Sequence, residues 1–148
     1  MATVELSFTA LPAHVRTARL VATAVARRSG VDESLLDEVR LAVGEACSRA
    51  VEGHQRYCPA EPVRLALTDH AGRFEVEVTD TCAPGARWPG SPGAADPGAS
   101  AEGDAYSSDP AGLGIAVIEG LADDVQISET PDGTSIRMSW PLARAIRN

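Results

Sequence analysis

Hydrophobic and polar residues alternate in five short segments of the chain, and each of these segments is predicted to form a strand. Residues 3–9, "TVELSFT", place hydrophobic side chains between polar neighbours, as a half-buried strand does. "VRLALTD" and "RFEVEVTD" follow the same pattern on either side of "HAG", which indicates a hairpin. "VQISET" and "SIRMSWP" flank the turn "PDGT" and predict a closing hairpin.

Hydrophobic residues at helical spacing predict three helices between these strands. Pro12 suits the first turn of the first helix, Gly30 is the expected stop, and Asp32 is placed to cap the second helix. In the first helix the positions expected to face the core are Leu11, Val15, Ala18, Ala22 and Val25. In the second helix they are Leu36, Val39, Val43, Ala46 and Ala50. In the third helix they are Ile115, Ile118 and Leu121.

The order of these elements is strand, two helices, two strands, a long loop, a helix and two strands. This order predicts an α+β fold, a two-layer sandwich of a mixed β-sheet with helices on one face. No boundary divides the chain, so residues 1–148 are expected to form a single domain. Residues 83–112 hold five of the ten prolines and six of the thirteen glycines. A flexible lid-like loop or a disordered insert is therefore expected at 83–111.

The charge and hydrophobicity of the chain indicate which kinds of binding partner and which cell compartment to expect. The formal net charge is −8, from 13 basic and 21 acidic residues, and the basic residues do not cluster as phosphate-backbone binding requires. Direct nucleic-acid binding is therefore not expected, and the acidic surface fits a basic protein partner better. No apolar run approaches 18 residues, and the first residues lack the apolar core of a signal peptide. These observations predict a cytoplasmic protein with no membrane span.

The cysteines and histidines give no sign of a metal site. An odd number of cysteines without metal-ligand spacing is typical of reduced, partly buried residues in a cytosolic protein. The three cysteines are Cys47, Cys58 and Cys82. No shared ligand spacing links the three histidines, which are His14, His54 and His70.

Three segments carry a resemblance to a known family: "LAVGEACSRAV", "EVEVTDTCAP" and "GLGIAVIEGLADDVQISETPDGTSIRMSW". In these segments and in its element order, the chain resembles the anti-sigma-factor serine kinases of bacterial partner-switching systems. That family belongs to the GHKL superfamily of histidine-kinase-like ATPases, and the resemblance implies its Bergerat-type fold. The third segment is the closest match, whereas the first matches only at its Glu and the second only at its Asp.

In the family, a helix carries a Glu that polarises the attacking hydroxyl and, four residues later, an Asn that coordinates Mg²⁺ on the ATP phosphates. Glu45 matches the Glu and is the relic general base that the resemblance implies, but Arg49 replaces the Asn. A guanidinium has no acceptor to offer to Mg²⁺. Two other interpretations stay open. The pair forms an ordinary i,i+4 surface ion pair worth about 0.2–0.5 kcal/mol, or Arg49 contacts phosphate directly without a metal.

The second motif of the family is Asp-x-Gly-x-Gly, whose Asp receives the adenine amino group. Asp80 is present, but Cys82 and Pro84 replace the glycines, and Asp80 is equally explained as a turn residue. Gly112 and Gly114 precede the third predicted helix, where the family holds phosphates at a helix N-terminus. A plain loop-to-helix turn explains these two glycines equally well.

The resemblance implies a regulatory protein that binds a sigma factor, the anti-anti-sigma factor that competes for it, or both. A homodimer is among the assemblies that it implies. It places the partner surface on residues 11–28, with Arg16 and Arg19 as candidate contacts. The altered motifs predict no cofactor and little or no kinase activity, whereas an intact site would bind ATP and Mg²⁺. The alternatives are an active serine/threonine kinase acting on an anti-anti-sigma factor, and an interaction module outside sigma regulation.

Overall fold

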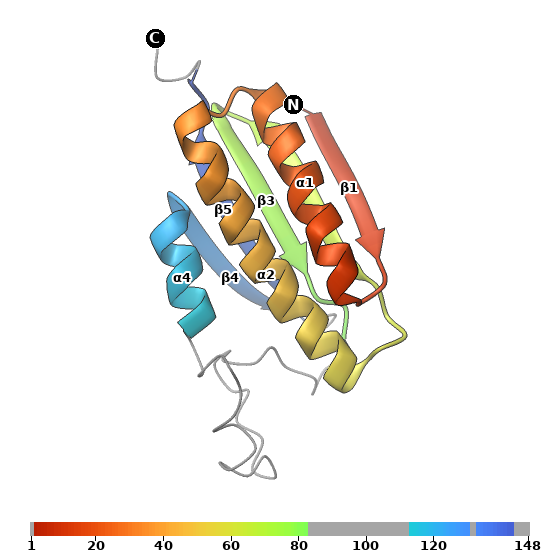
Figure 1. Cartoon of the computed structure of the whole chain (residues 1–148). Coiled ribbons are helices and arrows are strands. Elements are labelled where there is room, and N and C mark those ends of the chain that lie inside the picture. The colour runs from red at the N-terminus through yellow and green to blue at the C-terminus, as the bar shows by residue number, and fades with distance from the viewer. Residues whose placement is uncertain (1, 83–112, 131–132, 144–148) are drawn as a thin grey trace.

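Three helices cover one face of a five-stranded sheet in the part of the chain that the structure describes (Figure 1). The structure is a computed structural model, and it describes residues 2–82, 113–130 and 133–143. The strands are β1 (Ala2–Phe8), β2 (Val63–His70), β3 (Arg73–Thr79), β4 (Asp124–Thr130) and β5 (Gly133–Pro141). The helices are α1 (Pro12–Ser29), the short 3₁₀ turn η1 (Glu33–Leu35), α2 (Leu36–Tyr57) and α4 (Leu113–Leu121).

The strand order is β1-β2-β3-β5-β4, and every neighbouring pair is antiparallel. The predicted α+β class with helices on one face is confirmed, but the prediction of a mixed sheet is wrong for these strands. The reason lies in the connection from β3 through α4 to β4. This crossover makes β3 and β4 run in the same direction, yet β5 lies between them and is antiparallel to both.

Both ends of α1 are as the sequence predicts. Pro12 opens the helix, and Gly30 caps it in the left-handed conformation with φ of 107°. Asp32 accepts a hydrogen bond from the Ser34 N–H at 3.0 Å, so it caps η1, which leads directly into α2.

The core-facing stripe of α1 differs in part from the prediction. Val15, Ala18 and Ala22 are buried as expected, and Ala26 continues the stripe. Leu11 is 46% exposed because it stands before the helix as its N-cap residue, where its side chain is outside the helical stripe.

Helix α2 lies between α1 and α4 above the sheet (Figure 1). Its five predicted core residues are all buried, but burial extends well beyond that stripe. Because both flanks of α2 meet another helix, side chains on its sides are covered as well as those facing the sheet. This position places the buried Arg49 against α4, whereas the buried His54 lies against the segments that follow α2 and β3.

Helix α4 is fixed to the sheet through Trp140 of β5. The Trp140 indole Nε1 donates a hydrogen bond to the Leu121 carbonyl at 3.1 Å, and Ile118 is fully buried in the core. No helix in the described ranges combines the length and apolar character that crossing a membrane requires. The lid-like loop predicted at 83–111 lies outside the described residues, and so does Gly112.

Candidate functional site

The fold brings Glu45 and Arg49 of α2 against the first turn of α4. Gly114 is buried there, and a Cβ atom added to it would lie 2.6 Å from Glu45 Oε2 and 2.9 Å from Arg49 Cδ, with Arg49 Nη1 also in collision. A side chain at position 114 would therefore require Glu45 and Arg49 to shift. The structure therefore joins Glu45, Arg49 and Gly114, three residues that the sequence placed in two separate motifs.

Arg49 is a buried residue, with 2% of its surface exposed, whereas Glu45 is half-buried. The interpretation of the two as an ordinary surface ion pair is therefore wrong. Burial lowers the pKa of the Arg49 guanidinium from its usual value, and the neighbouring carboxylates of Glu45 and Glu52 oppose that shift. A guanidinium remains charged through such a shift. The site thus holds a buried positive charge next to the N-terminus of α4.

A magnesium ion coordinated at position 49 does not fit these residues. Mg²⁺ is coordinated by oxygen atoms in near-ideal octahedral geometry, and the Arg49 side chain has only N–H donors and a positive charge. The Arg49 guanidinium also occupies the space directly against Gly114. Glu45 supplies a carboxylate oxygen against Gly114.

Asp80 follows the last residue of β3 and is 2% exposed. Its carboxylate Oδ1 accepts a hydrogen bond from the Cys82 N–H at 2.8 Å, and its backbone N–H donates to the Thr134 carbonyl at 2.9 Å. Gly133, with φ of 150°, lies so close that an added Cβ would collide with the Asp80 carbonyl oxygen. Asp80 is therefore held by the segment that follows it and by the start of β5.

Two of the three cysteines are paired, contrary to the prediction that all three are reduced. Cys58, at the C-terminal end of α2, forms a disulfide with Cys82, two residues after Asp80. The two are 24 residues apart in sequence, and no local spacing announces the pair. Cys47 is a free thiol as predicted, and burial raises its pKa to about 12.

His54 lies beside this disulfide and is fully buried. One imidazole nitrogen and the two cysteine sulfurs lie within 4.8 Å of one another. The sequence separated the histidines into unrelated segments, so it missed this group, which forms only when α2 packs on the end of β3. The i,i+4 spacing of His54 and Cys58, about one helical turn, was the one signal available.

The two candidate partner-binding arginines of α1 differ in exposure. Arg16 is exposed, whereas Arg19 is half-buried because its aliphatic stem lies across Gly44 of α2. Arg19 therefore holds α1 against α2, which is a packing role.

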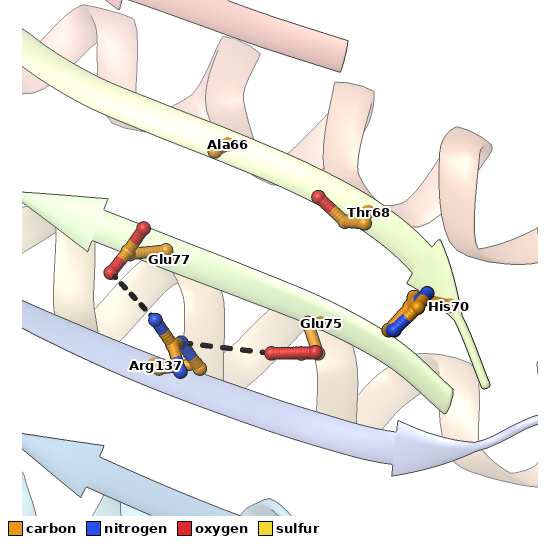
Figure 2. A pocket seen from close by; sticks show the side chains of 6 residues that line it. All are labelled: Ala66, Thr68, His70, Glu75, Glu77 and Arg137. Carbon is orange, nitrogen blue, oxygen red and sulfur yellow. Dashed lines mark ion pairs between the residues drawn. The ribbon is translucent and has the colours of Figure 1, made fainter. Parts of the chain in front are cut away.

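The open face of the sheet carries two shallow hollows of about 250 and 270 Å³. Figure 2 shows the first hollow, where Arg137 of β5 reaches between Glu75 and Glu77 of β3. The Arg137 Nε to Glu75 Oε1 distance is 3.6 Å, and the Arg137 Nη2 to Glu77 Oε2 distance is 3.5 Å. Glu75, Glu77 and Arg137 alternate with the buried residues of their strands, so these charges lie on the sheet face away from the core and are separate from Glu45 and Arg49 on α2.

Comparison with known protein families identifies the family to which this chain belongs. The sequence profile of the histidine kinase-like ATPase domain matches residues 8–140, which is most of the chain. The chain belongs to the histidine kinase-like ATPase domain family. This confirms the superfamily that the three sequence segments indicate. Among curated proteins, none matches the chain.

Two solved structures show the same fold at low sequence identity. The RsbU and RsbW domains of a Mycobacterium tuberculosis protein match with a TM-score of 0.67 and 17% identity, over 96% of this chain and 33% of that one. The histidine kinase domain of a blue-light activated histidine kinase from Erythrobacter litoralis matches with a TM-score of 0.50 and 17% identity, over 90% of this chain and 61% of that one. The chain thus spans about a third of the first protein and three fifths of the second.

Proposed function

We propose that this histidine kinase-like domain is a regulatory protein of the anti-sigma type, acting in the cytoplasm, with nucleotide binding lost or much reduced. It binds a sigma factor, the anti-anti-sigma factor that competes for it, or both. The observation that carries the proposal is the buried Arg49 packed against Gly114, where the family keeps the asparagine that ligates magnesium. The fold shared with the RsbW-containing structure supports the choice of partner class.

The surface of α1 supports protein binding. Helix α1 carries four arginines and no acidic residue, although the whole chain has a formal charge of −8. Arg16 is exposed, and Leu20, one turn further along the same face, is 58% exposed. An exposed apolar side chain with a basic residue beside it suits a partner surface that presents an apolar pocket rimmed by acidic groups.

Phosphorylation is not needed for such a switch. Two partners that compete for one surface exchange according to their relative affinities and concentrations. The family's ATP and Mg²⁺ would add control by phosphoryl transfer, but Arg49 removes the magnesium ligand and adds a positive charge in its place. Occupancy by either partner is then set by mass action alone.

Isothermal titration with ATP, with and without Mg²⁺, tests the loss of nucleotide binding. We expect no magnesium-dependent heat in the wild type. We also expect none in Arg49→Asn, because Cys82 and Pro84 still replace the loop glycines. Micromolar binding that requires Mg²⁺ in the wild type would contradict the proposal. Transfer of labelled phosphate from ATP to a candidate anti-anti-sigma factor would instead establish the active-kinase alternative.

Partner binding is tested by reversing a charge on α1. Arg16→Glu should weaken binding to a sigma factor or anti-anti-sigma factor captured with the wild type, mainly through slower association. Arg64→Glu is the matched control, because Arg64 is also exposed but lies on β2 of the sheet. Equal binding by the wild type and both variants would place the partner surface elsewhere.

A further inference from the structure

We propose that His54, Cys58 and Cys82 form a zinc-binding site in the form of the protein whose two cysteines are reduced. The three ligand atoms lie within 4.8 Å of one another. His54 lies in the last turn of α2, and Cys58 is the C-cap residue, whose N–H donates a hydrogen bond to the His54 carbonyl at 2.7 Å, so the end of the helix holds the two residues together. Cys82 reaches the same point from the segment that leaves β3. This site is separate from Glu45 and Arg49, and it does not depend on the proposed function.

The hydrogen bonds of His54 fix its ring in the state that binds a metal. The Thr81 N–H can only donate, so His54 Nε2, 3.1 Å away, carries a lone pair. The Glu61 carbonyl can only accept, so His54 Nδ1, 2.9 Å away, carries the proton. A neutral imidazole whose N–H is held by a backbone carbonyl is the usual arrangement of a metal-ligating histidine. The Nε2 lone pair is directed toward the Asp80–Cys82 segment, where it accepts the Thr81 N–H, so zinc binds at Nε2 only after it displaces this hydrogen bond.

The spacing of the ligand atoms suits a tetrahedral ion after a small adjustment. In a tetrahedral zinc site with the usual bond lengths, ligand atoms stand about 3.3–3.8 Å apart. The Cys58 and Cys82 Cα atoms are 5.7 Å apart, so the sulfurs need only separate from bonding distance to this spacing. Cys58 is half-buried at the C-terminal cap of α2, whereas Cys82 is buried.

The chemistry of the donors selects zinc over the magnesium of the family. Thiolate and imidazole ligands favour zinc, whereas magnesium takes oxygen ligands. The three protein donors leave the fourth position to a water molecule. The Asp80 carboxylate, whose Oδ1 is 3.8 Å from His54 Nε2, lies beside that position to accept a hydrogen bond from the water.

Disulfide formation and zinc binding exclude each other at these sulfurs. A disulfide sulfur carries no negative charge, and it is the thiolate that binds zinc. A phosphine reductant breaks the Cys58–Cys82 bond, takes an oxygen atom from water to become a phosphine oxide, and leaves two thiols. Zinc then replaces the two thiol protons, which pass to the solvent. The disulfide in this structure is thus the metal-free state of the same site.

The test uses the full chain, reduced with a phosphine and titrated with Zn²⁺ or Co²⁺ under nitrogen. We expect one equivalent of zinc to bind. Cobalt should give the intense visible bands of a tetrahedral ion and a thiolate-to-cobalt charge-transfer band in the near ultraviolet. Cys58→Ser and His54→Ala should each lower zinc affinity by at least about 10–100-fold, the loss that even an outer ligand partner produces. Cys47→Ala is the matched control, because it removes a cysteine outside the group and should bind as the wild type does.

Three outcomes for the reduced protein would overturn the site. The first is that the reduced wild type takes up no zinc. The second is that its cobalt complex lacks the thiolate-to-cobalt band. The third is that Cys58→Ser binds zinc as tightly as Cys47→Ala. Protein left in the disulfide form should bind no zinc, and equal binding by that form would also overturn the site. The cobalt spectrum of the wild type decides the question even if His54→Ala, which empties a buried position, does not fold.

Discussion

The contact between α4 and α2 predicts that one substitution has opposite effects at two glycines of the same helix. Gly120 is open to solvent, and nothing lies within 4 Å of an added Cβ atom. Gly120→Ala should therefore stabilise the protein by about 0.5–1 kcal/mol through helix propensity. Helix propensity stabilises Gly114→Ala by at most the same amount, but the new methyl group collides with the Arg49 and Glu45 side chains.

The size of the second effect follows from the packing. An added carbon in a filled site typically costs about 1–3 kcal/mol, and Arg49 cannot simply swing into solvent because it is 2% exposed. We expect Gly114→Ala to be destabilised by about 0–2.5 kcal/mol overall, which is this cost less the propensity gain. The difference between the two variants isolates the steric contribution, about 1–3 kcal/mol. At a typical urea m-value, this difference separates the unfolding midpoints by about 0.5–1.5 M.

A double-mutant cycle assigns the effect to its cause. In an Arg49→Ala background, most of the steric conflict is absent, so Gly114→Ala should become nearly neutral or stabilising there. The measurement is urea unfolding followed by circular dichroism for all four proteins and for Gly120→Ala. Equal midpoints for Gly114→Ala and Gly120→Ala, or the same effect of Gly114→Ala in both backgrounds, would refute the contact between the two helices.

Two further predictions concern ionisable groups. Asp32→Ala should lower the unfolding midpoint at pH 7, because the Ser34 hydroxyl and backbone N–H hold the Asp32 pKa below its usual value of 3.8. This stabilisation is fully present above pH 3.8 and is lost as pH falls through the lowered pKa, so the gap to wild type in pH-dependent urea unfolding should narrow there. Cys47 should resist alkylation at pH 8 in the native disulfide form and react fully in denaturant, because burial raises its pKa to about 12. Rapid native labelling, counted by mass spectrometry, would contradict its burial.

Local sequence signals predicted most of the elements of this fold. Pro12, Gly30 and Asp32 marked helix ends, since their backbone and capping preferences act over a few residues. The strand order was harder to predict from the sequence. It depends on β5 lying between β3 and β4, and this long-range pairing leaves no pattern in the local sequence. The expected mixed sheet was wrong for this reason.

The candidate site was predictable in its positions but less so in its environment. The family motifs located Glu45, Asp80 and Gly114, yet the i,i+4 spacing of Glu45 and Arg49 suggested a surface ion pair. A hydrophobic stripe identifies one buried face of a helix, and it cannot show that neighbouring helices cover the flanks as well. The disulfide between Cys58 and Cys82 was missed for a related cause, because only tertiary packing brings the two residues together.

Gly114 and Gly133 each have close neighbours in this structure that explain why a glycine stands there. Gly114 is needed where it stands because Arg49 and Glu45 fill the space of a side chain, and Gly133 is needed because the Asp80 carbonyl does. Both residues thus have a packing reason that requires no phosphate and no adenine ring. Their presence therefore does not count in favour of nucleotide binding, even though both lie in the segment that most closely resembles the family. Whether the protein binds a nucleotide depends instead on Arg49 and Cys82, whose side chains differ chemically from the residues of the family. Arg49 lacks any acceptor for magnesium, and Cys82 takes part in a disulfide where the family has a glycine.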